Sequence, residues 1–188
     1  SSNSIASRTQ GIVCYYYCIN PQISVREHGF FYSKVGKTGF SEHVPIDARE
    51  LDPYDLDHNI WYFTPVNRGL PSWVGPYHAK YLDEILMISY VTPVYKAGTL
   101  IGVLGMDIPF DTIISQISPI RVYDTGFACL LDQNGKILYH PELKMGDHLN
   151  ITEQSVYDML MQESSSGLEP IHYTVNNQER QMSFATLS

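Results

Sequence analysis

Two long apolar segments separated by a short turn constrain the fold of this chain most. Residues Ile85–Tyr95 and Leu100–Pro109 are rich in β-branched and aromatic side chains, and the intervening Lys96-Ala97-Gly98-Thr99 contains the glycine that a tight turn favours. We therefore predict a β-hairpin. A further strand candidate at Trp73–Ala79 extends this hairpin into an antiparallel meander.

The segments around this meander predict the rest of a first α+β unit. The run Ile12–Ile19 is apolar without polar alternation, which is typical of a central strand. The remaining segments predict a second strand at Phe30–Val35, a long acidic connection at Phe40–Asn59, a short helix at Ile60–Val66 and an amphipathic helix at Phe110–Ile117. In the acidic connection we expect Pro45 and Pro53 to block regular structure.

After Pro119 the same plan recurs on a smaller scale. The Asn134-Gly135 pair predicts a hairpin between Phe127–Asp132 and Lys136–His140. A helix at Thr152–Gln162 and a last hairpin between Ile171–Val175 and Gln181–Leu187 follow it. The predicted fold class is α+β, with two stacked units, residues 1–118 and 119–188, each built on an antiparallel sheet.

Composition excludes several function classes. The net charge is −8 and the 12 basic residues are scattered, whereas a nucleic-acid partner requires clustered Lys and Arg. No apolar stretch approaches the roughly 20 residues of a membrane helix, so the chain as given is expected to be soluble. The 14 tyrosines supply side chains with an apolar ring and a polar tip, which suit a wet binding pocket.

The sequence offers no metal, cofactor or catalytic motif. Cys14 and Cys18 share one face of a strand about 13 Å apart, too far for a disulfide, and are expected to be buried. No CxxC or HExxH spacing occurs. The acidic residues Asp52, Asp55 and Asp57 lack the glycine and the distant glutamate of a calcium loop, so we expect a solvated loop.

Four blocks in the first unit carry a family likeness. They are Trp61-Tyr62, Trp73-Val74-Gly75-Pro76-Tyr77, Ile88-Ser89-Tyr90-Val91-Thr92-Pro93-Val94-Tyr95 and Ile101-Gly102-Val103-Leu104-Gly105-Met106-Asp107-Ile108. In this order they resemble the membrane-distal module of double Cache sensors. The blocks Tyr123–Ala128 and Asp132–Pro141 look like the membrane-proximal module of the same family.

The resemblance implies two stacked PAS-like (Cache) modules on the extracytoplasmic side of a cell membrane. It also implies a long N-terminal helix, of which Ser1–Gln10 would be the end, and two membrane spans outside the given sequence. Members of the family feed histidine kinase, chemoreceptor or cyclic-dinucleotide output domains, and a homodimer formed through the missing helix is the family expectation.

The resemblance also implies a ligand pocket in the first unit. Family members that bind free amino acids carry Tyr, Arg, Trp, Tyr, Asp and Asp at positions that are Tyr54, Asn59, Trp61, Tyr77, Ala79 and Asp107 here. A carboxylate at the end of an apolar strand needs a partner, and a ligand ammonium would serve Asp107. Aromatic rings, with Trp73 beside those of Tyr54, Trp61 and Tyr77, would attract the same cation.

The departures from this pattern leave the ligand open. Asn59 cannot hold a carboxylate as Arg does, and Ala79 removes an acid. Either Arg68 reaches into the pocket, or the ligand lacks an α-carboxylate. The ligand is therefore an amino acid, an amine or another small polar metabolite, and we expect no ligand contact in the second unit.

Other interpretations remain open. Each pocket residue has a structural alternative, because rings pack in cores and a carboxylate can be satisfied by backbone donors or a lysine. The whole chain can then be a structural or protein-binding ectodomain whose pocket is filled by side chains. A hydrolase using Asp107 with His58 or His78 would need a nucleophile or metal, for which the sequence shows no signature.

Overall fold

The computed structural model describes residues 11–24, 26, 28–132, 134–148, 171–175 and 177–183. The chain divides into two compact units, Ser1–Ile113 and Ile114–Ser188. The division falls inside helix α3 (Phe110–Ile117), whereas the sequence placed it just after this helix, between residues 118 and 119.

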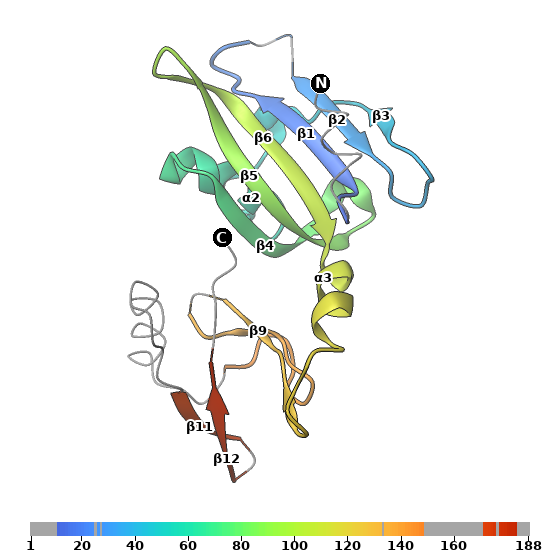
Figure 1. The fold of residues 1–188 in the computed structure, drawn as a ribbon. Helices are drawn as coiled ribbons and strands as arrows, with labels where there is room; N and C mark the ends of the chain where they lie inside the picture. Colours follow the sequence, from blue (N-terminus) through green and yellow to red (C-terminus); the bar gives the residue numbers. More distant parts are fainter. Residues whose placement is uncertain are drawn as a thin grey trace. The chain divides into compact units, whose positions relative to one another are not determined.

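The first unit is built on a six-stranded antiparallel sheet with the strand order β3-β2-β1-β6-β5-β4 (Figure 1). Its strands are β1 (Cys14–Ile19), β2 (Gly29–Ser33), β3 (Ser41–His43), β4 (Ser72–Ala79), β5 (Ile85–Lys96) and β6 (Thr99–Pro109). Strand β1 lies between β2 and β6, so the apolar segment near the start of the chain is a central strand, as its unbroken apolar pattern predicts.

The predicted hairpin forms the longest part of this sheet. β5 and β6 pair from Lys96↔Thr99 at the turn to Met87↔Pro109 at the far end. Ala97 and Gly98 both have positive φ, as the two central residues of a type I′ turn require. The pairing shifts by one residue between Val94 and Tyr95.

The connection predicted to be irregular contains more regular structure than its prolines suggest. It holds β3, a 3-10 turn η1 (Ala48–Glu50) and the first turn of helix α2 (Leu56–Arg68). The helix therefore begins four residues before the predicted start. Asp57 in its first turn favours this start, because acidic side chains stabilise a helix N-terminus. Gly69, with φ of 70°, ends the helix.

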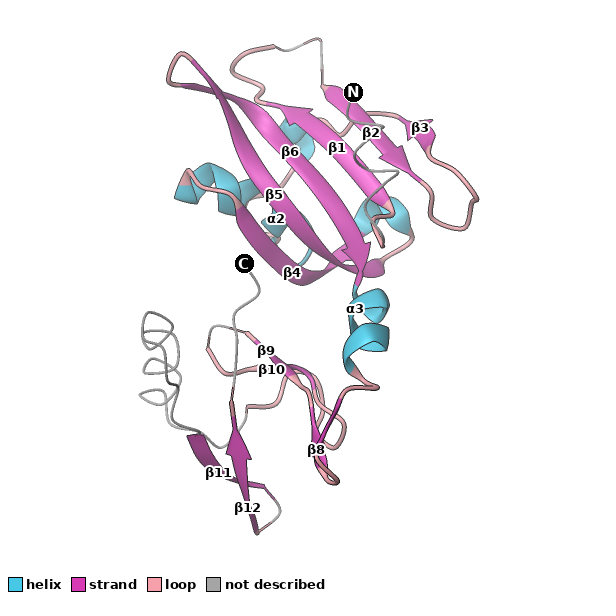
Figure 2. Ribbon diagram, in the orientation of Figure 1, coloured by secondary structure: helices cyan, strands magenta, loops and turns pink. Residues whose placement is uncertain are grey.

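The core of the first unit lies between α2 and one face of the sheet, as Figure 2 illustrates. Inward-facing side chains of β1, β5 and β6 pack against the buried face of the helix. The core residues include Cys14, Tyr16 and Cys18 of β1, Trp61 and Tyr62 of α2, Val74 and Tyr77 of β4, Met87 and Val91 of β5, and Val103 of β6. Cys14 and Cys18 are buried and unpaired, which confirms the prediction from their spacing.

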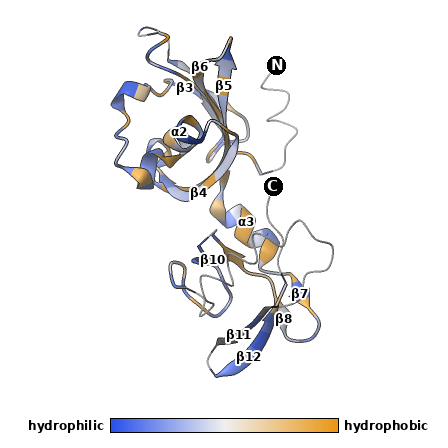
Figure 3. Ribbon diagram, turned by 90° about the vertical axis from the view of Figure 1, so that its left-hand side faces the viewer, coloured by the Kyte–Doolittle hydropathy of each residue, from blue (hydrophilic) through white to orange (hydrophobic). Residues whose placement is uncertain are grey.

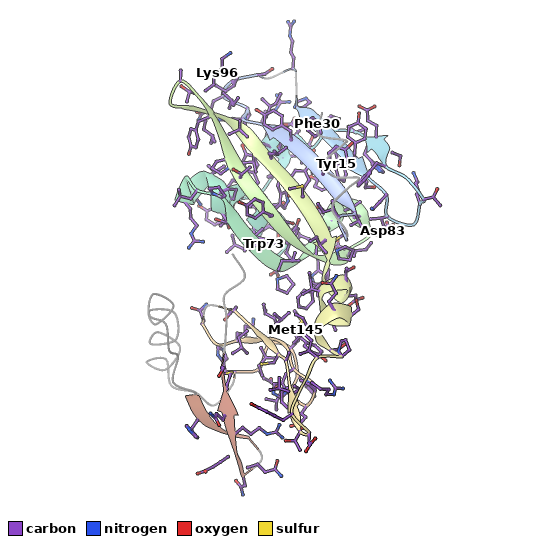
Figure 4. All side chains as sticks on the ribbon, in the orientation of Figure 1. Tyr15, Phe30, Trp73, Asp83, Lys96 and Met145 are labelled. Carbon is purple, nitrogen blue, oxygen red and sulfur yellow. The ribbon has the colours of Figure 1, made fainter. Side chains whose placement is uncertain are left out.

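A bulge in β4 sets which of its side chains face this core. Val74 pairs with Ser89 and Tyr77 with Met87, so β4 uses one residue more than β5 over this stretch. Val74 and Tyr77 consequently both face inward although they are three residues apart. Trp73 lies on the opposite face, where it packs against Tyr90 (Figure 4).

The second unit contains three two-stranded antiparallel sheets among its described residues. Their strands are β7 (Arg121–Val122), β8 (Gly126–Phe127), β9 (Leu130–Leu131), β10 (Ile137–Tyr139), β11 (Ile171–Val175) and β12 (Gln178–Met182). The buried Ile137 contacts Leu131, Leu143 and Met182. Figure 3 shows β12, with the sequence Gln-Glu-Arg-Gln-Met, as mainly hydrophilic.

Both predicted hairpins of this unit form, with different bounds. The first is shorter than predicted, because β9 and β10 hold two and three residues. The second begins its return strand at Gln178 and not at Gln181. The predicted helix at Thr152–Gln162 lies outside the described residues. Within the described part of the chain, no helix combines the length and apolar composition that a membrane span requires.

Candidate functional site

A small cavity of about 20 Å³ lies on the inner face of the first unit's sheet. Its walls come from β1, β2, β4, β6, α2 and the 3-10 turn η2 (Lys80–Leu82). The lining residues are Tyr16, Phe31, Ile46, His58, Trp61, Tyr77, Ala79, Lys80, Tyr81, Leu82 and Asp107. This volume accommodates a single atom group of about the size of a water molecule.

Asp107 forms the deep end of this cavity. Its side chain is 3% exposed, and its strand position pairs with Ser89 on one side and Cys14 on the other. Ser89 Oγ donates a hydrogen bond to Asp107 Oδ1 over 2.7 Å, and Tyr77 OH lies 2.9 Å from Ser89 Oγ. When Asp107 is ionised, its carboxylate can only accept, so Ser89 donates to Asp107 and Tyr77 donates to Ser89 Oγ.

No Lys, Arg or His of the described chain forms an ion pair with Asp107. Burial raises the pKa of this carboxyl to about 7, because removal from water penalises the charged form; the Ser89 and Tyr16 hydroxyls act in the opposite direction. The burial of Cys14, reinforced by the charge of Asp107, raises the pKa of that thiol. The site is therefore an acid that lacks a cation.

Aromatic rings surround the path from this acid outward. Tyr16 and Trp61 meet edge to face with ring centroids 4.8 Å apart, and Tyr16 also contacts Phe31 at 6.4 Å. Tyr16, Trp61 and Tyr77 are all at least 95% buried. Their ring faces provide an electron-rich wall next to the carboxylate, which favours a cation.

The exposed lining residues mark the outer end of the cavity. Tyr81 in η2 is 45% exposed, and the His58 side chain is 28% exposed. His58 Nδ1 lies 2.7 Å from Asp55 Oδ1, and its Nε2 lies 3.2 Å from Glu84 Oε2. Hydrogen bonding to Asp55, with the charges of Asp55 and Glu84, raises the pKa of His58. A protonated His58 thus forms ion pairs with both carboxylates and links the start of α2 to the turn before β5.

The structure brings three of the sequence-predicted site residues together at the cavity: Trp61, Tyr77 and Asp107. Asn59 is buried but does not line the cavity, and its Nδ2 donates to the carbonyl oxygen of Asp52 over 3.0 Å. That hydrogen bond holds the segment before α2, so the side chain is already committed to the backbone.

Tyr54, Arg68 and Trp73 do not reach the cavity, contrary to the arrangement expected of them. Tyr54 is 91% exposed, in the turn before α2. Arg68 is exposed in the last turn of the helix. Trp73 is 39% exposed on the outer face of β4 because of the bulge. Its labelled side chain can be followed in Figure 4.

Two residues of the site were missed by reasoning from sequence. Tyr16 lines the cavity from β1, and the fully buried Ser89 links Tyr77 to Asp107. A signal for Ser89 existed, since it is a small polar residue directly after the apolar run Ile85–Ile88 of β5. Tyr16 had none, because two further tyrosines flank it. The described residues contain no cluster of three or more His, Cys, Asp and Glu that could hold a metal ion.

The first unit, a sheet with a helix and a buried acid on one face, is a PAS-like α+β module. The chain belongs to the Cache domain family, since the family model of the double form, dCache_1, matches residues 13–188. This membership confirms the resemblance and the α+β fold class predicted from sequence. Cache domains of this kind are sensor domains and not enzymes.

Chemotaxis receptors are among the similar proteins. Methyl-accepting chemotaxis protein McpA of Pseudomonas putida is 27% identical over 161 residues, which cover 85% of this chain and 24% of McpA. The chain thus spans about a quarter of that relative.

Solved structures share the fold. A methyl-accepting chemotaxis protein X superposes with a TM-score of 0.65 at 20% identity, over 91% of this chain and 65% of that one. The ligand-binding domain of the Pseudomonas aeruginosa amino acid chemoreceptor PctB, in complex with L-Arg, superposes with a TM-score of 0.57 at 18% identity, over 96% of this chain and 66% of that one.

Proposed function

We propose that this chain is the extracytoplasmic, ligand-sensing part of a transmembrane signalling receptor of the chemoreceptor, histidine kinase or diguanylate cyclase type. Its ligand is a small molecule with an ammonium group, an amino acid or an amine, held in the first unit, which is the membrane-distal one. Asp107 pairs with the ammonium, and Trp61 and Tyr77 enclose it. The remainder of the receptor tethers the domain to the membrane and pairs it into a homodimer.

The observation that carries this proposal is the unneutralised, buried carboxylate of Asp107. An isolated charge in a protein interior is costly, so such a group either stays protonated or meets a cation. Here its pKa is about 7, which leaves both states accessible at neutral pH. An incoming ammonium favours the ionised form of Asp107 and forms with it an ion pair that aromatic rings shield from water.

The absence of a cation opposite Asp107 shapes the ligand class. Lys80 is the one Lys or Arg among the described residues that line the cavity, and it lies on the exposed η2 turn. A carboxylate on the ligand would therefore be held near the outer end or not at all. The described polar groups at the deep end suit an ammonium group and offer nothing to a ligand carboxylate. We therefore favour amines over amino acids.

A structural ectodomain with no small ligand is the competing function, and the cavity volume favours it. Small-molecule pockets commonly measure about 300–1,000 Å³, whereas this cavity measures about 20 Å³. A sensor needs α2 and η2 to separate before anything larger than water enters. Binding of this kind selects an open conformation and biases the receptor between two states.

A thermal-shift screen against amino acids, primary amines and carboxylates separates the two functions. A ligand at 100 times its Kd stabilises the folded state by about 2.7 kcal/mol, which a shift in Tm reports readily. We expect amines to raise Tm in the parent protein and to have no effect on Asp107→Asn, which keeps the shape of the side chain without its charge. No shift with any compound at saturating concentration would contradict the sensor function.

A further inference from the structure

The hydroxyl of Tyr16 is a buried polar group without a hydrogen-bond partner in the described part of the chain. Its residue is 3% exposed, and its ring lines the cavity beside Asp107. The hydroxyl lies near Asp107, Ser89 and Tyr77, close enough to affect the pKa values of Asp107 and Tyr77, yet it reaches hydrogen-bonding geometry with none of the three. Buried hydroxyls are nearly always paired, so an unpaired one on a residue that lines a cavity calls for an explanation.

Tyr77 provides the contrast within the same site. Its hydroxyl is equally buried and faces the same acid, but it is hydrogen-bonded to Ser89 at 2.9 Å. The protein therefore satisfies one of the two phenols internally. The described part of the chain leaves the other phenol, that of Tyr16, without such a partner.

A glycine in the central strand β6 makes the position of Tyr16 possible. Tyr16 pairs with Gly105 across the sheet, and a Cβ on Gly105 would lie 2.2 Å from Tyr16 Cζ and 2.4 Å from its hydroxyl oxygen. The Tyr16 ring thus occupies the space that a side chain on Gly105 would fill. Because Asp107 is the next inward-facing residue of β6, this places the phenol alongside the carboxylate.

We propose that Tyr16 binds the ligand directly, with its hydroxyl oxygen accepting a hydrogen bond from the same ammonium that pairs with Asp107. The inference rests on the proposed function and narrows its ligand. An ammonium that serves both Asp107 and Tyr16 must carry at least two N–H bonds. The ligand is a primary or secondary amine and not a quaternary one, whose methyl groups would leave Tyr16 unpaired.

The cavity volume supports the same conclusion. About 20 Å³ beside Tyr16 and Asp107 accepts an NH₃⁺ group, which is close to water in size. A trimethylammonium group requires several times that space at the deep end, where the walls are strand backbones and packed rings. The rest of the ligand extends toward the exposed end at Tyr81 and His58, where opening is less costly.

Two variants that each remove one hydroxyl test the assignment. Tyr16→Phe loses no internal hydrogen bond, so its Tm should equal or exceed that of the parent, while Tyr77→Phe should melt at a lower temperature. Isothermal titration with n-propylammonium and with L-alanine should show about tenfold weaker binding by Tyr16→Phe, the usual effect of losing one hydrogen bond to a charged group.

The N,N,N-trimethyl derivatives of both compounds supply a test that needs no variant. The parent protein should bind each primary ammonium at least tenfold more tightly than its trimethyl derivative, and Tyr16→Phe should narrow that gap. Equal affinity for the two forms, or binding of neither primary ammonium, overturns the inference. So does a Tyr16→Phe variant that binds like the parent or melts as low as Tyr77→Phe.

Failure of this inference is distinguishable from failure of the proposed function. If Asp107→Asn loses binding while Tyr16→Phe retains it, the sensor site stands and Tyr16 is a packing residue. If Asp107→Asn itself binds like the parent, the site has been misplaced altogether.

Discussion

The two units each hold a cavity, and the larger one has the weaker chemistry. The cavity of the second unit measures about 230 Å³, and that of the first about 20 Å³. The larger cavity is lined by Ser118, Arg121, Asp124, Thr125, Gly126, Phe127, Tyr139 and Pro141. Arg121, Asp124 and Thr125 are exposed. Charges in contact with water bind a ligand weakly, so volume alone would select the less suitable cavity.

The polar groups of the second unit are also largely satisfied. Arg121 donates to the carbonyl oxygens of Ser118 and Ile120, and Arg180 pairs with Glu142 at 3.0 Å. The exception is His140 Nε2, which is buried without a partner among the described residues but is not among those that line the cavity. In the first unit, by contrast, the unsatisfied groups and the cavity coincide.

The largest expected effect tests this contrast directly. Asp107→Asn should weaken the binding of an amine hit more than 100-fold, since removing one partner of a buried ion pair typically costs about 3–5 kcal/mol. Arg121→Ala and Asp124→Asn should change the affinity less than about twofold, as expected for exposed charges away from the site. Isothermal titration calorimetry measures all three. The reverse order of effects would move the binding site to the second unit.

The second prediction is that the stability of the first unit depends on pH through Asp107. The folded-state pKa of Asp107 is about 7, above its ordinary value of 3.8, so the folded protein favours the protonated acid. Stability from this group is full below the unfolded pKa and is lost as pH rises through about 7. The groups facing Asp107 are Cys14, Tyr16, Tyr77 and Ser89, and none of them changes charge in this range.

Binding should respond with the opposite sign. An ammonium needs the ionised carboxylate, so below about pH 7 the affinity should fall about tenfold per pH unit. The experiment compares the parent with Asp107→Asn by denaturant titration and calorimetry between pH 4.5 and 8.5. The parent should gain stability relative to Asp107→Asn as pH falls. A difference that is independent of pH would mean that Asp107 does not titrate in the folded protein.

The third prediction uses glycines as steric probes of each unit. Gly105→Ala pushes a methyl group into the Tyr16 ring and should cost about 1–3 kcal/mol of stability while also weakening binding. In Gly126→Ala the new Cβ meets the Val122 carbonyl oxygen at 2.3 Å, which should destabilise the second unit and leave binding intact. Gly39→Ala is the control, because its Cβ would meet nothing within 4 Å. Urea unfolding and calorimetry report both quantities.

The elements of the first unit were largely predictable because their apolar patterns are long, but their registers were not. Continuing the pairing Lys96↔Thr99 without interruption places Ser89 opposite Met106. The register shift between Val94 and Tyr95 places Ser89 opposite Asp107 instead. A one-residue slip moves every side chain to the other face, so the hydrogen bond at the centre of the site depends on a bulge that composition does not announce.

Trp73 and Tyr54, which the sequence placed in the pocket, lie away from this cavity for two different reasons. Alternation along a regular strand puts Trp73 and Tyr77 on one face, and the bulge of β4 separates them. Tyr54 matched a family position by letter, yet it precedes the cap of α2 and faces solvent. Trp61 and Asp107 were predicted from the family pattern, and Asp107 also from its place at the end of an apolar strand; both residues line the cavity.

The smallest expected effects come from two histidines whose pKa values shift in opposite directions. Hydrogen bonding to Asp55 raises the pKa of His58 in the first unit, and burial lowers the pKa of His140 in the second. His58 therefore adds stability below its unfolded pKa and loses it as pH rises through the folded value. His140 adds stability above its unfolded pKa and loses it as pH falls through the folded value.

Matched substitutions resolve these two signs. In His58→Gln the loss of Tm relative to the parent should be greatest near pH 5 and should fade toward pH 8, because the ion pairs with Asp55 and Glu84 need the imidazolium. In His140→Asn the amide oxygen replaces Nδ1 as acceptor for the amides of Glu142 and Leu143. Any remaining loss there should fade toward low pH, since only the neutral imidazole fits the buried position. The contrast is between an ion-paired His58 beside the proposed ligand site and a neutral, buried His140 in the second unit. It would be refuted if the loss of Tm in both variants changed with pH in the same direction.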